Sequence, residues 1–316
     1  MSLYLITGGA GFIGSNIVEE LVRQNVRVRV VDNLSTGRRE NLQALKNKIE
    51  FLELDISDLD DLKAALRGVD FVLHQAAIPS VPRSVEDPVL SHNANLTGTL
   101  NVLWAAKQAG VKRVVYAASS SAYGDSQVLP KREDLQAKAI SPYGLMKYVG
   151  EEYCRLFTEL YGLETVSLRY FNVFGPRQDP SSPYSGVLSR FIAGMLTGTP
   201  PTIFGDGEQS RDFTYVSNVV RGNLLACYAK GVAGKMYNLA CGTRITLNEV
   251  VACLNKLLGA NLIPTYNPPR VGDIKHSLAD ITLASKDLNY QPLVNFDTGL
   301  KMTVEWYRKH LAATLA

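Results

Sequence analysis

The sequence predicts an α/β protein with a Rossmann-like, doubly wound parallel sheet and a smaller C-terminal α/β substrate-binding lobe. In the first half, short apolar runs alternate with amphipathic stretches, a pattern typical of βαβ units whose helices cover both faces of a sheet. A glycine-rich turn directly follows the first apolar run. After Phe171 the composition changes, and a segment with three prolines begins. The 316 residues are enough for one large domain and a smaller lobe.

The first half contains six predicted strands with helices between them. The strands are expected at Leu3–Thr7, Arg27–Asp32, Ile49–Leu54, Phe71–His74, Arg113–Ala118 and Thr165–Arg169. The helices are expected at Phe12–Arg23, at Leu59–Leu66, from about Pro88 to Ala109 and from about Pro142 to Tyr161.

The second half begins with a loop or lid over Gly175–Gly186. It continues with the segment Ser189–Leu196, a hairpin around Thr202–Phe213, and helices near Val216–Ala229, Leu247–Leu258 and Thr298–His310. We therefore expect a first domain over residues 1–171 and a second over 172–316, with part of 210–245 packing back on the first.

Composition excludes several classes of function. The net charge is only +3 and no basic run stands out, which argues against nucleic acid or a membrane surface as partner. The four cysteines show no metal-ligand spacing, so no metal is expected. No segment reaches the ~18 apolar residues of a membrane span, and the N-terminus lacks a basic leader. We expect a cytoplasmic protein.

The segment from Thr7 to Gly14 predicts a phosphate-binding turn. Gly8, Gly11 and Gly14 are three residues apart between a predicted strand and a predicted helix. Glycines there permit a tight turn and close approach of the backbone to a pyrophosphate, which the helix N-terminus then binds.

Asp32 ends the second predicted strand, at the distance from the turn expected of a ribose-binding carboxylate. Such a carboxylate accepts hydrogen bonds from the ribose hydroxyls and repels a 2′-phosphate, which favours NAD over NADP. Arg38 and Arg39 lie near enough to leave NADP use open. Asp55 follows the third strand and is a candidate contact to adenine, with a helix N-cap as its alternative role.

Tyr143 and Lys147 are four residues apart, so both lie on one face of the helix that Pro142 begins. An ammonium beside the phenol, near a positive nicotinamide ring, is expected to lower the tyrosine pKa and make it a general acid/base. The Ser119-Ser120-Ser121 cluster closes the preceding strand and supplies a hydroxyl for the same substrate oxygen.

Nearly the whole chain resembles the extended short-chain dehydrogenase/reductase family and, within it, the UDP-sugar 4-epimerases. The markers are the glycine turn, residues 32–37, 74–77 and 119–124, Asn95 with Gly98-Thr99, Ser141–Lys147, the Arg169–Pro176 segment and Arg211-Asp212-Phe213. The resemblance implies NAD as cofactor, bound by Gly8, Gly11, Phe12, Ile13, Gly14, Asp32, Asn33, Ser35, Thr36, Gly37, Asp55, Ile56, Gln75, Ala76, Ala77, Asn95, Tyr143, Lys147 and Tyr170.

The resemblance also implies a catalytic set of Ser119, Tyr143 and Lys147, with Ser121 as the alternative serine. Tyr143 takes the proton of the sugar 4-hydroxyl while C4 gives a hydride to the nicotinamide, Ser119 binds the same oxygen, and Lys147 binds the nicotinamide ribose. The 4-keto sugar turns and is reduced on its other face. Dehydratases of the family place Asp-Glu directly after the catalytic threonine, and decarboxylases carry a nearby Glu. Here Ser120, Ser121 and Ala122 follow, which favours epimerisation.

The same resemblance implies where the substrate binds. The predicted contacts are Ser119, Ser121, Tyr143, Asn172, Val187, Leu188, Thr202, Phe204, Arg211, Arg270, Asp273 and Ser277. Epimerases restricted to UDP-glucose and UDP-galactose resemble one another in a bulky Tyr two residues before an Ala-Asp. Here Ser277 precedes Leu278-Ala279-Asp280, which leaves room for an acetamido group. We expect UDP-GlcNAc/UDP-GalNAc as substrates, with UDP-Glc/UDP-Gal turnover open.

Two alternatives remain. One keeps the fold and changes the reaction to a UDP-glucuronate 4-epimerase, for which Arg83 is a candidate cation, or to another nucleotide-sugar oxidoreductase or dehydratase. The other is a non-catalytic NAD-sensing module, which has no need of the serine, tyrosine and lysine together. A homodimer through the helices near 88–109 and 142–161 is a family expectation.

Overall fold

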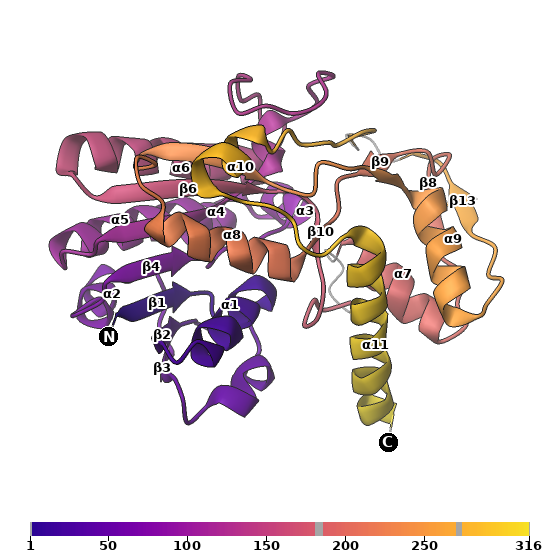
Figure 1. Ribbon diagram of the computed structural model, residues 1–316, viewed down its shortest axis with the longest axis horizontal. Coiled ribbons are helices and arrows are strands. Elements are labelled where there is room, and N and C mark those ends of the chain that lie inside the picture. The colour runs from indigo at the N-terminus through magenta and orange to yellow at the C-terminus, as the bar shows by residue number, and fades with distance from the viewer. Residues whose placement is uncertain (1, 181–185, 270–273, 316) are drawn as a thin grey trace.

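A seven-stranded, all-parallel sheet forms the centre of the computed structural model, which describes residues 2–180, 186–269 and 274–315 (Figure 1). The strand order is β11-β6-β5-β4-β1-β2-β3. The strands are β1 (Leu3–Thr7), β2 (Arg27–Val31), β3 (Glu50–Leu52), β4 (Phe71–His74), β5 (Arg113–Ser119), β6 (Glu164–Tyr170) and β11 (Lys235–Leu239). The predicted doubly wound α/β fold is confirmed.

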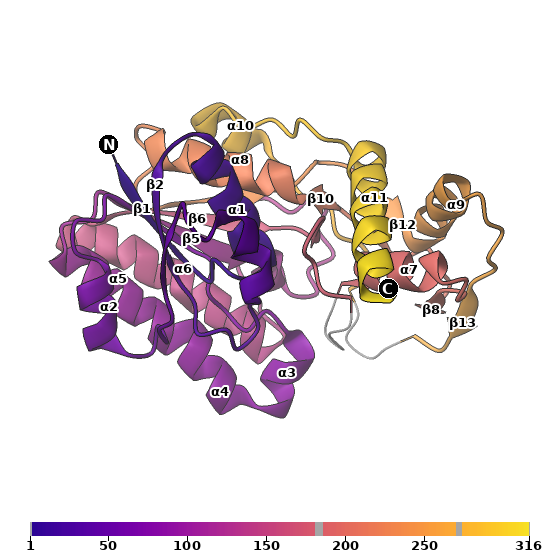
Figure 2. The ribbon, with the colours of Figure 1, turned by 90° about the horizontal axis from the view of Figure 1, so that it is seen from below.

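Helices cover both faces of this sheet, which explains why strands such as β1 read as continuous apolar runs with every residue buried (Figure 2). On one face, Ile17 and Val18 of α1 share a core with Val219 and Ala226 of α8. On the other face, Leu62 of α2 joins residues of α5 and α6. The bounds are α1 (Phe12–Arg23), α2 (Leu59–Ala65), α5 (Gly98–Gln108), α6 (Pro142–Tyr161) and α8 (Val216–Tyr228).

The helical run predicted from Pro88 to Ala109 contains an irregular turn. It consists of α4 (Pro88–His92), a π-helical turn over Asn93–Thr97, and α5. A short helix that was not predicted, α3 (Val81–Glu86), precedes it, capped by Ser80. Further short helices that were not predicted are the 3₁₀ turns at Arg39–Leu45 and Ser120–Tyr123, and α10 (Thr282–Leu288).

The second lobe packs α7, α9 and α11 around its own apolar core, which includes Phe174, Ile192 and Val250. In both views α11 lies between the sheet and the end that carries α7 and α9. The elements are β7 (Val173–Phe174), α7 (Val187–Leu196), β8 (Thr202–Phe204), β9 (Ser210–Arg211), β10 (Thr214–Tyr215), β12 (Ile245–Thr246), α9 (Leu247–Leu258), β13 (Thr265–Asn267) and α11 (Phe296–Leu315).

The hairpin predicted around Thr202–Phe213 is wrong. β8 pairs in parallel with β13, and β9 pairs antiparallel with β12. Gly205 and Gly207 have φ of 96° and 80°, so they do form the turn that the sequence suggested. Each strand instead pairs with a strand of the same length that lies later in the chain.

Two segments from the second half pack on the main sheet. β11 pairs with β6 along five residues, and α8 covers β5 and β6. The division of the chain at residue 171 stays a prediction, and these returning segments would make its first unit discontinuous.

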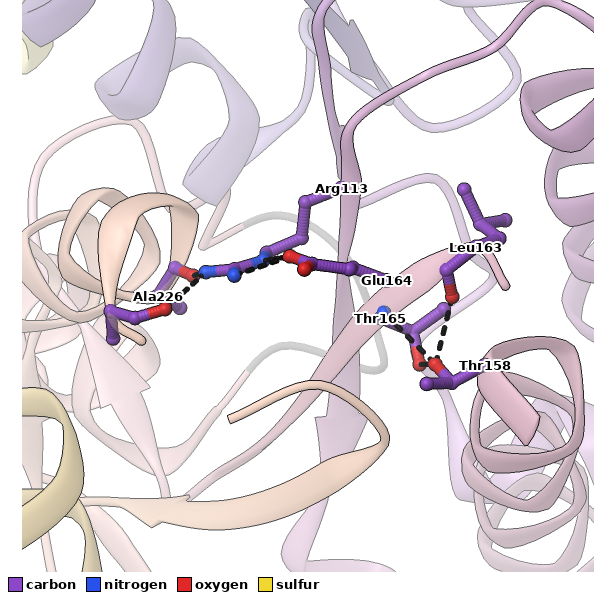
Figure 3. Close-up of polar contacts among 7 residues, drawn as sticks. Arg113, Thr158, Leu163, Glu164, Thr165 and Ala226 are labelled. Atoms are coloured by element: carbon purple, nitrogen blue, oxygen red, sulfur yellow. Dashed lines mark hydrogen bonds and ion pairs between the residues drawn. The ribbon is translucent and has the colours of Figure 1, made fainter. Parts of the chain in front are cut away.

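Arg113, at the beginning of β5, connects the end of α8 to the sheet through hydrogen bonds (Figure 3). Its guanidinium donates to the Ala226 and Ala229 carbonyls at the end of α8, at 2.7 and 2.8 Å, and to the Glu164 carboxylate at 2.9 Å. A cation at a helix C-terminus satisfies carbonyls that the helix leaves unpaired. This contact lies at the amino ends of the strands, which leaves their carboxyl ends open for a site. Within the described ranges, no helix combines the length and apolarity needed to cross a bilayer.

Candidate functional site

A cavity of about 870 Å³ opens at the carboxyl ends of β1, β2, β4, β5 and β6. Crevices at this edge of a parallel sheet are the usual place for a nucleotide ligand. Nearly all of the predicted cofactor residues line it: Gly8, Gly11, Phe12, Ile13, Gly14, Asp32, Asn33, Ser35, Thr36, Gly37, Asp55, Ile56, Gln75, Ala76, Ala77, Tyr143, Lys147 and Tyr170.

The glycine turn has the geometry that its spacing predicts. Gly8 has a φ of +67°, which favours glycine, and its carbonyl oxygen would lie 2.1 Å from a Cβ added at Gly14. Gly11 begins α1 without a capping side chain. The amides of the first helical turn are therefore available to an anion, as the pyrophosphate of a dinucleotide requires.

Asp32 is buried at the end of β2. Its two oxygens accept hydrogen bonds from Ala10 N–H at 2.9 Å and Leu34 N–H at 2.8 Å. Burial raises the pKa of this carboxyl, and the two amide donors act in the opposite direction. The two amides thus orient the carboxylate at the cavity wall, where its oxygens can also accept hydrogen bonds from the ribose hydroxyls of NAD.

Asn95, a predicted cofactor contact, is not among the described residues that line the cavity. It is fully buried in the π-helical turn, where its side chain accepts from Ile78 N–H at 2.7 Å and donates to the Ile78 carbonyl at 3.2 Å. Both polar ends of the amide are thereby used on the loop after β4. Asn95 fixes the position of a loop that does line the cavity, through Gln75, Ala76, Ala77 and Ile78.

Ser119, Tyr143 and Lys147 meet in this cavity. Ser119 is the last residue of β5, and Tyr143 lies in the first turn of α6, where Ser141 caps the helix and Pro142 follows. Ser84 of α3 accepts a hydrogen bond from the Tyr143 backbone N–H at 3.1 Å, which anchors this turn. The Lys147 ammonium donates to the Ala117 carbonyl at 2.9 Å.

Burial dominates the electrostatics of Tyr143: it raises the pKa of the phenol, while the hydrogen bond with Ser119 acts in the opposite direction. The lowered pKa expected of Tyr143 beside an ammonium and a positive nicotinamide ring stays a prediction. Burial lowers the pKa of Lys147 to about 8, while Glu151 acts in the opposite direction.

A second cavity of about 230 Å³ adjoins the first and shares Asn172, Val173, Gln178 and Gly186 with it. Among the predicted substrate residues, Asn172, Val187, Leu188, Thr202, Phe204 and Arg211 line it, while Ser119, Ser121 and Tyr143 line the first cavity. Arg270 and Asp273 lie outside the described residues. Ser277 lines neither cavity, and its backbone N–H donates to the Ser210 carbonyl at 3.0 Å.

Several lining residues were not predicted as site residues. Among them are Ile78, Pro79, Ser80 and Ala94, the neighbours Gln178 and Asp179, and in the second cavity Arg190, Gln209 and Phe213. Ile78, Pro79 and Ser80 lie in the loop that follows the predicted strand Phe71–His74, and their position after a strand end is a usable signal. Gln178 and Asp179 follow a two-residue strand that the sequence does not reveal. No group of acidic, histidine and cysteine side chains able to hold a metal ion occurs in the part of the chain that the structure covers.

Comparison with known proteins gives consistent matches. A family model described as the NAD dependent epimerase/dehydratase family matches residues 4–240. The chain is 40% identical to a putative UDP-glucose 4-epimerase of Methanocaldococcus jannaschii, over 98% of this chain and 99% of that protein. A UDP-glucose 4-epimerase of Thermotoga maritima with UDP-glucose has a TM-score of 0.93 at 40% identity, covering 98% and 99% of the two chains. A UDP-N-acetylglucosamine 4-epimerase of Methanobrevibacter ruminantium in complex with UDP-N-acetylmuramic acid has a TM-score of 0.94 at 38% identity, with the same coverage.

Proposed function

Because the chain belongs to the NAD-dependent epimerase/dehydratase family, we propose that it inverts C4 of a UDP-hexose with NAD held in the first cavity. The resemblance stated above and the expectation of NAD are both confirmed. The observation that carries the proposal is the meeting of Ser119, Tyr143 and Lys147 in a cavity that also contains the glycine turn and Asp32.

The proposed reaction assigns the proton to the protein and the electrons to the cofactor. NAD, when bound, supplies a reversible acceptor for the C4 hydrogen of the sugar. Tyr143 takes the proton of the 4-hydroxyl, and Ser119, within hydrogen-bonding reach of the phenol, orients the same oxygen. Since burial raises the pKa of Tyr143, the positive charges of Lys147 and of the oxidised cofactor are needed together to favour the phenolate.

The distribution of carboxylates favours epimerisation over elimination of water. In the described lining of the first cavity the acidic residues are Asp32, Asp55 and Asp179. Asp32 and Asp55 follow β2 and β3, and Ser119 is followed by Ser120 and Ser121 at the end of β5. A dehydratase needs an acid and a base beside the sugar. The end of β5 carries the hydroxyl groups of Ser119, Ser120 and Ser121 instead.

We propose UDP-GlcNAc and UDP-GalNAc as the preferred pair. The support is the likeness to an epimerase whose name carries that substrate, together with the small side chain that the family resemblance favours at Ser277, a residue that lines neither described cavity. A second candidate is UDP-glucuronate, because Arg83 lines the first cavity and is a possible partner for a C6 carboxylate.

Purified protein should be incubated separately with UDP-GlcNAc, UDP-Glc and UDP-GlcA, without added NAD, and the products analysed by chromatography. The proposal predicts the C4 epimer of UDP-GlcNAc without stoichiometric NADH. A keto-deoxy sugar or a pentose product would refute it. Selective loss of UDP-GlcNAc turnover in Ser277→Tyr would support the role of a small residue at this position in admitting the acetamido group, whereas equal loss on UDP-Glc would contradict it. A preference for UDP-GlcA that Arg83→Met removes would establish the second candidate.

The acid/base assignment needs its own test. Tyr143→Phe should abolish turnover while the bound NAD is retained. Tyr148→Phe, five residues further along α6 and outside both cavities, is the matched control and should keep full activity. Full activity in Tyr143→Phe would show that another group carries the proton.

We also propose a homodimer through the helices of residues 88–109, which include α4 and α5, and through α6. The support is a set of apolar side chains exposed on these helices, Val89, Leu145 and Leu160, which are 69%, 54% and 67% exposed. Light scattering after gel filtration tests the mass of the particle, and a monomer at micromolar concentration would contradict this assignment.

A further inference from the structure

Two arginines follow the ribose-binding carboxylate, and both are engaged by carboxylates elsewhere in the chain. Arg38 forms an ion pair with Asp179, from the loop after β7. Arg39 forms an ion pair with Glu53, and its guanidinium lies over the Phe51 ring, 4.7 Å from the centroid. An arginine shortly after the ribose-binding carboxylate commonly binds the 2′-phosphate of NADP. The partners of the Arg38 and Arg39 side chains therefore affect the choice between NAD and NADP.

Arg38 is the arginine placed to reach that phosphate. It lines the first cavity, whereas Arg39 is absent from the described lining. The preceding Gly37 lies directly against Asp32, since a Cβ added there would be 2.8 Å from both carboxylate oxygens. The Arg38 backbone N–H donates to the Ala10 carbonyl at 3.0 Å, which fixes the chain beside the glycine turn. The Arg38 side chain therefore starts next to the ribose carboxylate.

Asp179 is held in place by the residues before it. Arg177 donates to the Asn16 side chain at 2.8 Å and pairs with Glu19, both on α1. The Gln178 carbonyl accepts a hydrogen bond from the Tyr307 hydroxyl of α11. These contacts bring a carboxylate from the second half of the chain to the wall of the cofactor cavity, which Asp179 lines.

The Arg38–Asp179 pair is half-exposed, with 57% and 33% of the two side chains accessible. Pairs this exposed contribute little to the stability of the fold. Asp179 does, however, neutralise the positive charge of Arg38 that would attract a 2′-phosphate. Its carboxylate is also a second acidic group, beside Asp32, in the lining of the cavity.

We propose that Asp179 is a specificity determinant that enforces NAD over NADP by holding Arg38 in an ion pair. With Asp179 present, a 2′-phosphate must compete with a carboxylate on the same chain for the guanidinium. Without it, the Arg38 guanidinium loses this competing carboxylate, and a charge-assisted contact with the phosphate becomes more favourable. This inference depends on cofactor binding alone and stands whichever sugar is the substrate.

The test compares the occupancy of NAD and NADP in Asp179→Asn with that in the wild type. Protein is equilibrated with equal concentrations of NAD⁺ and NADP⁺, freed of unbound nucleotide and denatured, and the released cofactors are quantified by chromatography. The ratio of NADP to NAD should rise roughly threefold to tenfold, the range expected of one partly exposed charge-assisted contact.

Two further variants make the result decisive. Glu53→Gln breaks the other arginine's ion pair, which is also exposed, and should leave the ratio unchanged because Arg39 does not line the described cavity. Arg38→Met combined with Asp179→Asn should return the ratio to the wild-type value. An unchanged ratio in Asp179→Asn, an equal rise in Glu53→Gln, or a rise that persists in the double variant would each overturn the proposal.

Discussion

Replacing Lys147 with methionine should change how the stability of the protein depends on pH. Only 3% of Lys147 is exposed, and burial lowers its pKa from 10.5 to about 8, with Glu151 and Cys154 acting in the opposite direction. The folded chain therefore disfavours the protonated amine that the unfolded chain carries. A pKa difference of this size corresponds to about 3 kcal/mol.

The sign of the effect follows from the protons bound in each state. Between about pH 8 and 10.5 the unfolded chain keeps a proton on Lys147 that the folded chain has released. The contribution of this residue to the free energy of unfolding therefore rises with pH across that window. Below pH 8 the full penalty is present, and above 10.5 it has disappeared. The methionine variant lacks the rise, because it has no amine to titrate.

The assay is urea unfolding of wild type and Lys147→Met at intervals from pH 7 to 10.5. The stability difference between the two proteins should shift by about 3 kcal/mol in favour of the wild type across this range. Loss of the hydrogen bond to Ala117 displaces the whole curve without altering its shape. Lys301→Met, at an exposed position on α11, is the control and should run nearly parallel to the wild type. Parallel curves for Lys147→Met would refute the reasoning.

Three further outcomes follow from the structure. Glu151→Ala should lower the free energy of unfolding by about 3 to 5 kcal/mol, because it leaves the buried Arg169 guanidinium without its counter-ion. In the wild type, Arg169 donates to the Glu151 carboxylate in two hydrogen bonds of 2.9 and 2.6 Å. A loss below about 1 kcal/mol in urea unfolding would contradict this prediction. Gly14→Ala should abolish retention of NAD, because the new Cβ would lie 2.1 Å from a backbone oxygen of the turn. Gly194→Ala, where the nearest atom is 3.6 Å away, is the control, and equal NAD content in both purified variants would argue against the fit. Thr246→Ala removes the capping box of α9 and should cost about 1 kcal/mol, seen as a lowered melting temperature; an unchanged melting temperature would show that the cap contributes nothing.

The strands and helices of the first half were predictable because their signals are local. β1 and β4 are apolar runs bounded by turn residues, and Ser141 with Pro142 marks the beginning of α6. The site residues at strand ends, such as Asp32 and Ser119, follow directly, since parallel strands bring their carboxyl ends to one edge.

The remaining features depend on contacts between distant parts of the chain. The sequence of β11 has no property that distinguishes an added edge strand, and its partner β6 lies far upstream. Asn95 has the residue type of a ligand, but the π-helical turn directs its amide into the protein. The position of Asp179 is set by Asn16, Glu19 and Tyr307, all distant in sequence.

Because β11 lies far downstream of its partner β6, the order of synthesis affects how this protein folds. A fragment that ends at residue 171 contains β6, but the edge that β11 covers would be unpaired, with free amide and carbonyl groups in line. During synthesis on the ribosome, this edge of β6 stays unpaired until all of α8 and β11 has been synthesised. We therefore expect the nascent chain to pass through a state prone to self-association, and shortened forms to aggregate until they extend past residue 239.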